Sequence, residues 1–159
     1  MKLRKLSSAL VVFFALGLGL AFVQAQEEET PEIDYRQKLM KGQGASMGSI
    51  GDILKYKLPG GSAHVATHAK NISEYAMLIA DAFKEEIAAG KTDAKPEVWQ
   101  NWDDFVAKAN ALNVAGTELA AAAAGGDMRA MMPNVKALGD ACGGCHDVYR
   151  KPKEERFAR

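Results

Sequence analysis

Apolar residues recur at helical spacing along four long stretches of the chain, and no stretch alternates apolar and polar residues as a strand would. In the first stretch the apolar positions lie seven residues apart, at Ile33, Met40, Met47 and Leu54. This spacing places their side chains on one face of a helix. Proline, here Pro31, is tolerated in a helix's opening turn. The pattern therefore predicts a first helix over 31–57.

Glycine and proline divide the rest of the chain into three further helices. The segment 58–62 contains Pro59, Gly60 and Gly61 and ends the first helix. A second helix is expected over 63–89 and is ended by Gly90. A polar connection over 91–96 leads to a third helix over 97–124. Connections this short favour antiparallel neighbours.

The fourth helix is predicted after the turn Gly125-Gly126, with Asp127 as its N-cap. Its apolar positions alternate at spacings of three and four residues: Met128, Met131, Val135, Leu138, Cys142, Cys145 and Tyr149. These residues are expected on its buried face. Pro133 is expected to kink this helix or to delay its regular start. Four helices with short turns predict an all-α protein, an antiparallel up-down-up-down four-helix bundle.

The N-terminus has the layout of a secretory signal peptide. Basic residues come first, at Lys2, Arg4 and Lys5, and an apolar stretch then runs from Leu10 to Val23. That stretch is shorter than the roughly 20 residues that span a bilayer, so no membrane span is expected in the mature chain. Cleavage after Ala25 predicts a signal peptide over 1–25, one mature domain over 26–159, and export to a bacterial periplasm.

The charge balance gives no support to nucleic-acid binding. The chain has 20 acidic and 20 basic residues, and three of the basic ones lie in the predicted signal peptide. The mature chain therefore carries a small net negative charge. No group of residues suggests a catalytic nucleophile or an acid–base pair, so an enzyme is not expected.

The strongest chemical signal lies at 142–146. The only two cysteines of the chain, Cys142 and Cys145, are three residues apart, and His146 follows directly. Cys-x-x-Cys-His is the attachment pattern of c-type haem. Two thiols form thioethers with the two vinyl groups of one haem, and the adjacent imidazole reaches the iron from the same side. On a helix these three residues fall within roughly 100° of arc, so one face presents them all.

A cysteine pair has three other common roles: a redox-active dithiol, part of a zinc site, or a disulfide. A thioredoxin-like dithiol accompanies a strand–helix–strand pattern, which the sequence does not show. A structural zinc site takes four protein ligands, and the two thiols with His146 supply three. A disulfide is ordinary in an exported protein, but it leaves the adjacent histidine without a role. The predicted cofactor is one haem c per chain.

The sequence resembles the class II c-type cytochromes, the family of cytochrome c′ and its low-spin relatives such as cytochrome c-556. The resemblance covers essentially the whole mature chain and rests on 35–41, Tyr-Arg-Gln-Lys-Leu-Met-Lys, and on 141–150 at the end of the last helix. It implies that Cys142 and Cys145 hold the haem and that His146 is the proximal axial ligand of the iron.

Further residues are assigned roles by the same resemblance. Arg150 matches a basic residue near the proximal histidine, and Arg36 matches an arginine near a haem propionate. Tyr149 is expected to pack on the haem or on the bundle. Met40, four residues after Arg36, matches the position that faces the distal side of the iron, where the low-spin relatives have a coordinating methionine and the high-spin members often have leucine or another non-ligand. Met47 is a second candidate for a distal ligand, although packing in the core is its expected role.

The sixth coordination position separates two functions. If Met40 binds the iron, the protein is a one-electron carrier with His/Met ligation, which raises the reduction potential relative to nitrogenous pairs. If Met40 only packs in the core, as helical methionines often do, a vacant distal site suits nitric oxide or carbon monoxide. The expected partners are redox proteins, and the resemblance also allows a homodimer through the first two helices.

Overall fold

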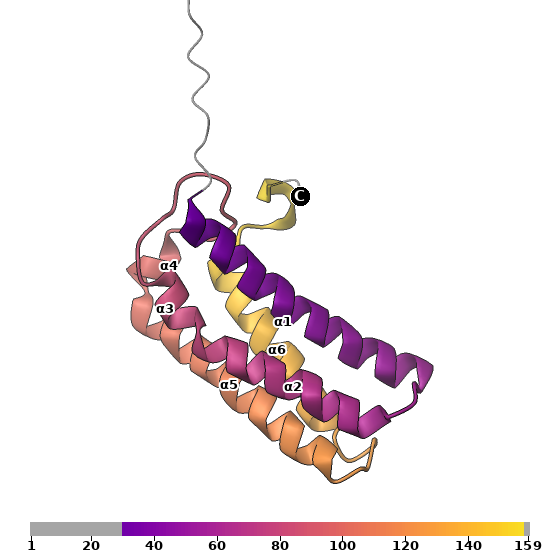
Figure 1. Cartoon of the computed structure of the whole chain (residues 1–159). Coiled ribbons are helices and arrows are strands. Elements are labelled where there is room, and N and C mark those ends of the chain that lie inside the picture. Colours follow the sequence, from indigo (N-terminus) through magenta and orange to yellow (C-terminus); the bar gives the residue numbers. More distant parts are fainter. Residues whose placement is uncertain (1–29, 158–159) are drawn as a thin grey trace, which may run out of the picture.

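The structure, a computed structural model, describes residues 30–157, which form a bundle of four long helical segments (Figure 1). The helices are α1 (Pro31–Tyr56), α2 (Gly61–Met77), α3 (Ile79–Phe83), α4 (Glu97–Gln100), α5 (Trp102–Ala124) and α6 (Met132–Tyr149). A short 3-10 helix, η1 (Lys153–Glu155), follows. The predicted all-α four-helix bundle is confirmed. The predicted signal peptide over 1–25 lies outside the described residues.

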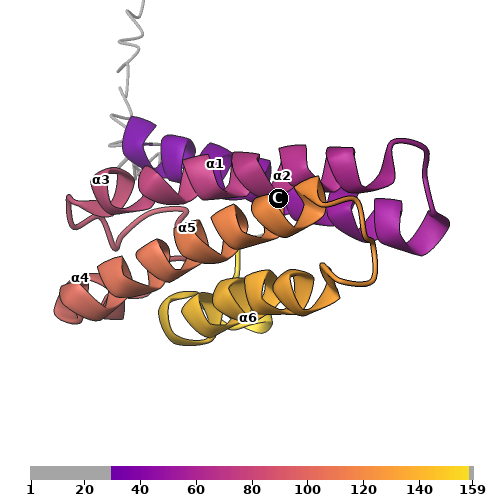
Figure 2. The same cartoon turned by 90° about the horizontal axis from the view of Figure 1, so that it is seen from below.

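The packing of the long helices is uneven. α2 and α5 form the most extensive pair, α1 packs on α2, and α6 packs on α5, whereas α1 and α6 do not pack closely against each other. Figure 2 shows α5 between the α1–α2 pair and α6. The core is apolar, and its largest fully buried side chains are Ile50, Val65, Ile72, Val98, Leu119, Met131 and Leu138. None of the helices in residues 30–157 combines the length and hydrophobicity that a bilayer-spanning segment needs.

The second helix is shorter than predicted. α2 ends at Met77, α3 ends at Phe83, and a connection over 84–96 replaces the expected helix to Ala89. The carbonyl groups of Ala82 and Phe83 accept hydrogen bonds from the side chains of Arg36 (2.7 Å) and Trp99 (2.8 Å). Carbonyls used in this way do not bind the amide groups of a following helical turn. The prediction of a helix over 63–89 was therefore wrong beyond Phe83.

The third predicted helix begins at Glu97 as expected but is interrupted at Asn101, and the fourth begins later than predicted. Asn101 adopts a non-helical conformation (φ −122°, ψ 48°) and separates α4 from α5. Asp127 does not cap α6, because the helix begins at Met132. The Oδ1 atom of Asp127 instead accepts hydrogen bonds from the amides of Arg129 and Ala130, in the turn before the helix. Pro133 lies in the opening turn of α6. Of the two predicted effects of this proline, the delayed start is confirmed.

Gly116 marks the closest approach of α2 and α5. A Cβ atom at this position would lie 3.0 Å from the Ala69 carbonyl oxygen and 3.0 Å from the Ser73 amide. We expect Gly116→Ala to lower the free energy of unfolding by up to about 2 kcal/mol, because overpacking, which costs about 1–3 kcal/mol, outweighs the roughly 1 kcal/mol that alanine gains in a helix. Gly44→Ala is the matched control, since nothing lies within 4 Å of its Cβ position, and it should stabilise the protein. Urea denaturation measures both; equal stabilisation would contradict the close approach.

Candidate haem-attachment site

The Cys-x-x-Cys-His motif lies on the last turns of α6. Cys142 and Cys145 are half-buried, pack against the hydrophobic core and are free thiols. His146 is exposed. The prediction that the whole motif lies on the buried face was therefore wrong for His146. Leu138 and Tyr149 are buried, and the two thiols lie between them at the edge of the core. That edge is where a bound group could reach both sulfurs without displacing the core.

The protonation states of the motif follow from its surroundings. Burial raises the pKa of the Cys142 thiol, and it raises the pKa of Cys145 to about 11, with nearby Lys108 opposing the shift. Although much of His146 is exposed, neighbouring protein atoms remove water from the imidazole and lower its pKa, and the charges of Arg150 and Arg156 act in the same direction. A neutral imidazole is the form that binds a metal.

The helix opposite the motif presents apolar side chains. Met40, Met47 and Leu54 of α1 are half-buried and touch the core, and their spacing of seven residues places them on one face of the helix. The Cε atom of Met47 lies 3.8 Å from the Cβ position of Gly139 on α6, so this face of α1 is turned towards α6. Two free thiols, an adjacent imidazole and a loosely packed apolar face suit haem c, a flat and largely apolar group.

The end of α6 is held by the connection over 84–96. Asp93 is buried, and its carboxylate accepts hydrogen bonds from Arg150 (Nη2 to Oδ2, 3.3 Å) and from the amide of Phe157 (3.2 Å). Backbone hydrogen bonds join Lys95 to Tyr149 and Lys151 to Asp93. Arg150 therefore lies one turn beyond His146, as the resemblance implies, and is fixed there by Asp93. This contact could not be predicted from the sequence, because 91–96 carries no periodic pattern of apolar residues.

Tyr149 packs on the bundle from the same turn of α6. Its ring meets that of Phe105 edge-on at 5.2 Å, and its hydroxyl donates to Asp104 Oδ2 at 2.6 Å. Burial is the first cause that raises the pKa of Tyr149 to about 12, and the hydrogen bond and negative charge of Asp104 add to it. Of the two places predicted for Tyr149, these contacts support packing on the bundle.

The raised pKa of Tyr149 predicts a loss of stability in alkali. The unfolded chain releases the phenolic proton near pH 10, whereas the folded protein keeps it until about pH 12. Between these values the folded state binds more protons, so the free energy of unfolding falls as the pH rises. We expect Tyr149→Phe to make this fall shallower. Urea denaturation at several alkaline pH values compares the two proteins; equal slopes would contradict the assignment.

Arg36 is buried, and its side chain binds backbone carbonyls of the protein. Its guanidinium group donates to the carbonyls of Ala82 (2.7 Å), Glu85 (2.7 Å) and Ile87 (3.4 Å). It also stacks over the ring of Phe83 at 4.8 Å. Burial lowers the pKa of the guanidinium. Three of the five N–H groups of the guanidinium are thus used by these carbonyls, and the propionate contact of Arg36 stays a prediction.

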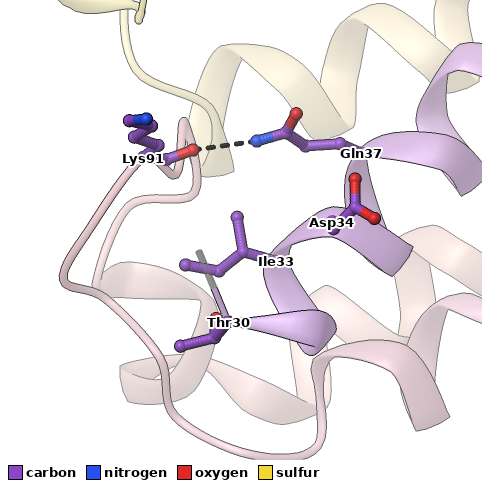
Figure 3. A pocket seen from close by; sticks show the side chains of 5 residues that line it. All are labelled: Thr30, Ile33, Asp34, Gln37 and Lys91. Carbon is purple, nitrogen blue, oxygen red and sulfur yellow. Dashed lines mark hydrogen bonds between the residues drawn. The ribbon is translucent and has the colours of Figure 1, made fainter. Parts of the chain in front are cut away.

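A small pocket lies beside the first turns of α1 (Figure 3). It is lined by Thr30, Ile33, Asp34, Gln37 and Lys91. Figure 3 shows the Gln37 side chain reaching across it, where Nε2 donates to the Lys91 carbonyl at 2.9 Å. This hydrogen bond ties α1 to the connection over 84–96. None of the three residues of the attachment motif lines this pocket.

Comparison with known proteins agrees with the predicted haem c cofactor. A model of the family described as Cytochrome C' matches residues 31–150. A cytochrome c' of Pararhodospirillum photometricum is 37% identical over 75% of this chain and 95% of its own, and a cytochrome c-556 of Agrobacterium fabrum is 34% identical over 96% and 99%. Among solved structures, cytochrome c prime from Shewanella frigidimarina has a TM-score of 0.70 at 31% identity and covers 76% of this chain and 94% of its own.

Two other solved relatives are described with a ligand or an assembly. One is a nitric oxide complex of a cytochrome c prime variant from Alcaligenes xylosoxidans, and the other is a cytochrome c' with ligand-controlled dimer dissociation. Both have a TM-score of 0.66, at 26% and 28% identity. These descriptions concern the relatives.

Proposed function

Because the chain belongs to the cytochrome c' family of haem c proteins, which carry electrons or bind gases, we propose that it is a periplasmic one-electron carrier. In this proposal Cys142 and Cys145 hold the haem through thioethers, and His146 and Met40 are the axial ligands of the iron. The haem supplies the ferric–ferrous couple, and the chain supplies its ligands, its apolar surroundings and the nearby positive charge of Arg150.

The position of Met40 is the observation that carries this proposal. Met40 is half-buried on the face of α1 that is turned towards α6, and it touches the core rather than filling it. A thioether with three rotatable bonds adapts readily to a ligand geometry. The relative named cytochrome c-556 is similar to this chain over almost its whole length, and the sequence resemblance connects such proteins with methionine ligation. These observations support Met40 as the sixth ligand in this proposal.

The second candidate is a five-coordinate protein that binds nitric oxide or carbon monoxide at a vacant distal site. The relatives named cytochrome c', and the nitric oxide complex of one of them, favour it. The same structural features serve both candidates, because α1 and α6 do not pack closely and the side chains between them are apolar. The candidates differ only in whether the Met40 sulfur binds the iron.

Optical spectra of the ferric and ferrous protein test the proposal. We expect a six-coordinate low-spin spectrum in both oxidation states, with little change when carbon monoxide is added. A five-coordinate high-spin ferrous spectrum that changes at once with carbon monoxide would reject Met40 ligation and select the second candidate. If the protein did not show the characteristic haem c spectrum at all, both candidate functions would be rejected.

The proposed partners are redox proteins and a second copy of the chain. A homodimer through α1 and α2 is supported by aromatic side chains on the outside of these helices: Tyr35 and Tyr75 are 48% and 38% exposed. Tyr75 also lies across Gly42, with its ring 3.0 Å from the Cβ position, which joins the two helices into one surface. The solved relative with dimer dissociation shows that this fold can assemble.

A further inference from the structure

Gln43 of α1 is a buried amide without a partner. The residue is only 7% exposed, and its Nε2 atom makes no hydrogen bond within the described part of the chain. Buried side-chain donors are nearly always bonded, and leaving one unpaired costs about 1–3 kcal/mol. The amide therefore needs an acceptor that is not in place beside it in residues 30–157 of this structure.

The place of Gln43 on α1 indicates where that acceptor lies. Gln43 is three residues after Met40 and four before Met47, and residues so spaced are neighbours on one helix face. Long helical side chains lean towards the helix N-terminus, so the amide of Gln43 covers the turn that carries Met40. Two other buried polar atoms also lack partners, Thr30 Oγ1 and His68 Nδ1, but neither shares this face. Only Gln43 adjoins the predicted distal ligand.

We propose that the Gln43 amide donates a hydrogen bond to the atom that occupies the distal side of the haem iron. The inference rests on the haem lying between α1 and α6, as in the proposed function, and it does not require Met40 to be the ligand. The acceptor is a lone pair on the atom that lies next to the iron on its distal side. It belongs to the Met40 sulfur, a weak acceptor, if the protein is six-coordinate, and to a bound diatomic gas if it is five-coordinate.

The test uses Gln43→Leu in the haem-loaded protein. Leucine is similar in size, has no donor and, unlike methionine, cannot bind iron. Asn113→Leu is the control for loss of a bonded amide, because Asn113 Nδ2 donates to the Ser73 carbonyl (3.0 Å) and hydroxyl (2.8 Å). Urea unfolding is measured with carbon monoxide bound if the protein is five-coordinate, so that the proposed acceptor is present. We expect both substitutions to lower the midpoint, since each then removes a bonded amide. A higher midpoint for Gln43→Leu would show that the amide is unpaired in the holoprotein and would overturn the proposal.

A haem readout then identifies the acceptor. If the protein is six-coordinate, loss of a donor to the sulfur strengthens its donation to ferric iron and lowers the reduction potential. A more apolar side chain alone would raise it, so a fall is specific to the hydrogen bond. If the protein is five-coordinate, the probe is carbon monoxide on the ferrous iron, and the C–O stretching frequency should rise in Gln43→Leu and stay unchanged in Asn113→Leu. An unchanged or raised potential in the first case, or an unchanged frequency in the second, overturns the proposal.

Discussion

Replacing Met40 by alanine should convert a six-coordinate low-spin haem into a five-coordinate high-spin one. Alanine has no lone pair to offer, and α1 presents no imidazole or thiol on this face, because the described stretch of α1 contains neither histidine nor cysteine. The vacated position would be open to carbon monoxide. We therefore expect the ferrous variant to bind carbon monoxide where the parent protein does not, as measured by optical titration.

Met47→Ala is the matched control for this substitution. Met47 is the next methionine on the same face of α1 and is also half-buried against the core. Both substitutions remove comparable packing, so both should lower the free energy of unfolding, by less than the 2–5 kcal/mol or so of a fully buried methionine. Only Met40→Ala should change the spin state. A spectrum altered by Met47→Ala alone would identify Met47 as the ligand, and no change in either variant would show that both methionines only pack.

The four-helix architecture was readable from the sequence because each long helix keeps a regular apolar spacing. The first helix was predicted over 31–57 and ends one residue earlier, at Tyr56. The error in the second helix has a different origin. Its apolar spacing continues through Phe83 to Ile87, but Arg36 and Trp99, distant in sequence, take the carbonyls that would extend the helix. A local pattern does not contain such long-range donors.

The haem-attachment site shows the same difference between local patterns and contacts made by residues distant in sequence. Cys142, Cys145 and His146 are neighbours in sequence, so their chemistry is visible in the motif itself. The carboxylates that hold the surrounding turn, Asp93 and Asp104, come from other elements and bind Arg150 and Tyr149 only in the folded chain. Chemistry confined to one helical turn can thus be predicted from the sequence, and the side chains that orient that turn require the fold.

Replacing Arg36 by leucine should be among the most destabilising single changes in the bundle. It removes the donors of three carbonyls, at Ala82, Glu85 and Ile87, and a cation over the ring of Phe83. Unsatisfied buried carbonyls cost about 1–3 kcal/mol each, and the connection over 84–96 is exposed enough at Glu85 for water to replace part of this loss. We expect the free energy of unfolding to fall by about 3 kcal/mol. Arg129→Leu, at an exposed position, should change it by less than about 0.5 kcal/mol.

The redox behaviour of the Arg36 variants separates its two roles. If the guanidinium serves only the carbonyls, Arg36→Leu should weaken the fold while the reduction potential keeps its pH dependence, because no charge near the haem is lost. If the guanidinium binds a propionate in the loaded protein, the variant should lose a stabilising partner of that carboxylate, and the potential should vary with pH over a higher range. Arg36→Lys sharpens the comparison: a lysine keeps the charge but lacks the planar fork that reaches several carbonyls at once. An altered pH dependence in Arg36→Leu that is absent from Arg36→Lys would assign Arg36 to the haem, whereas an unaltered pH dependence in both variants would assign it to the carbonyls alone.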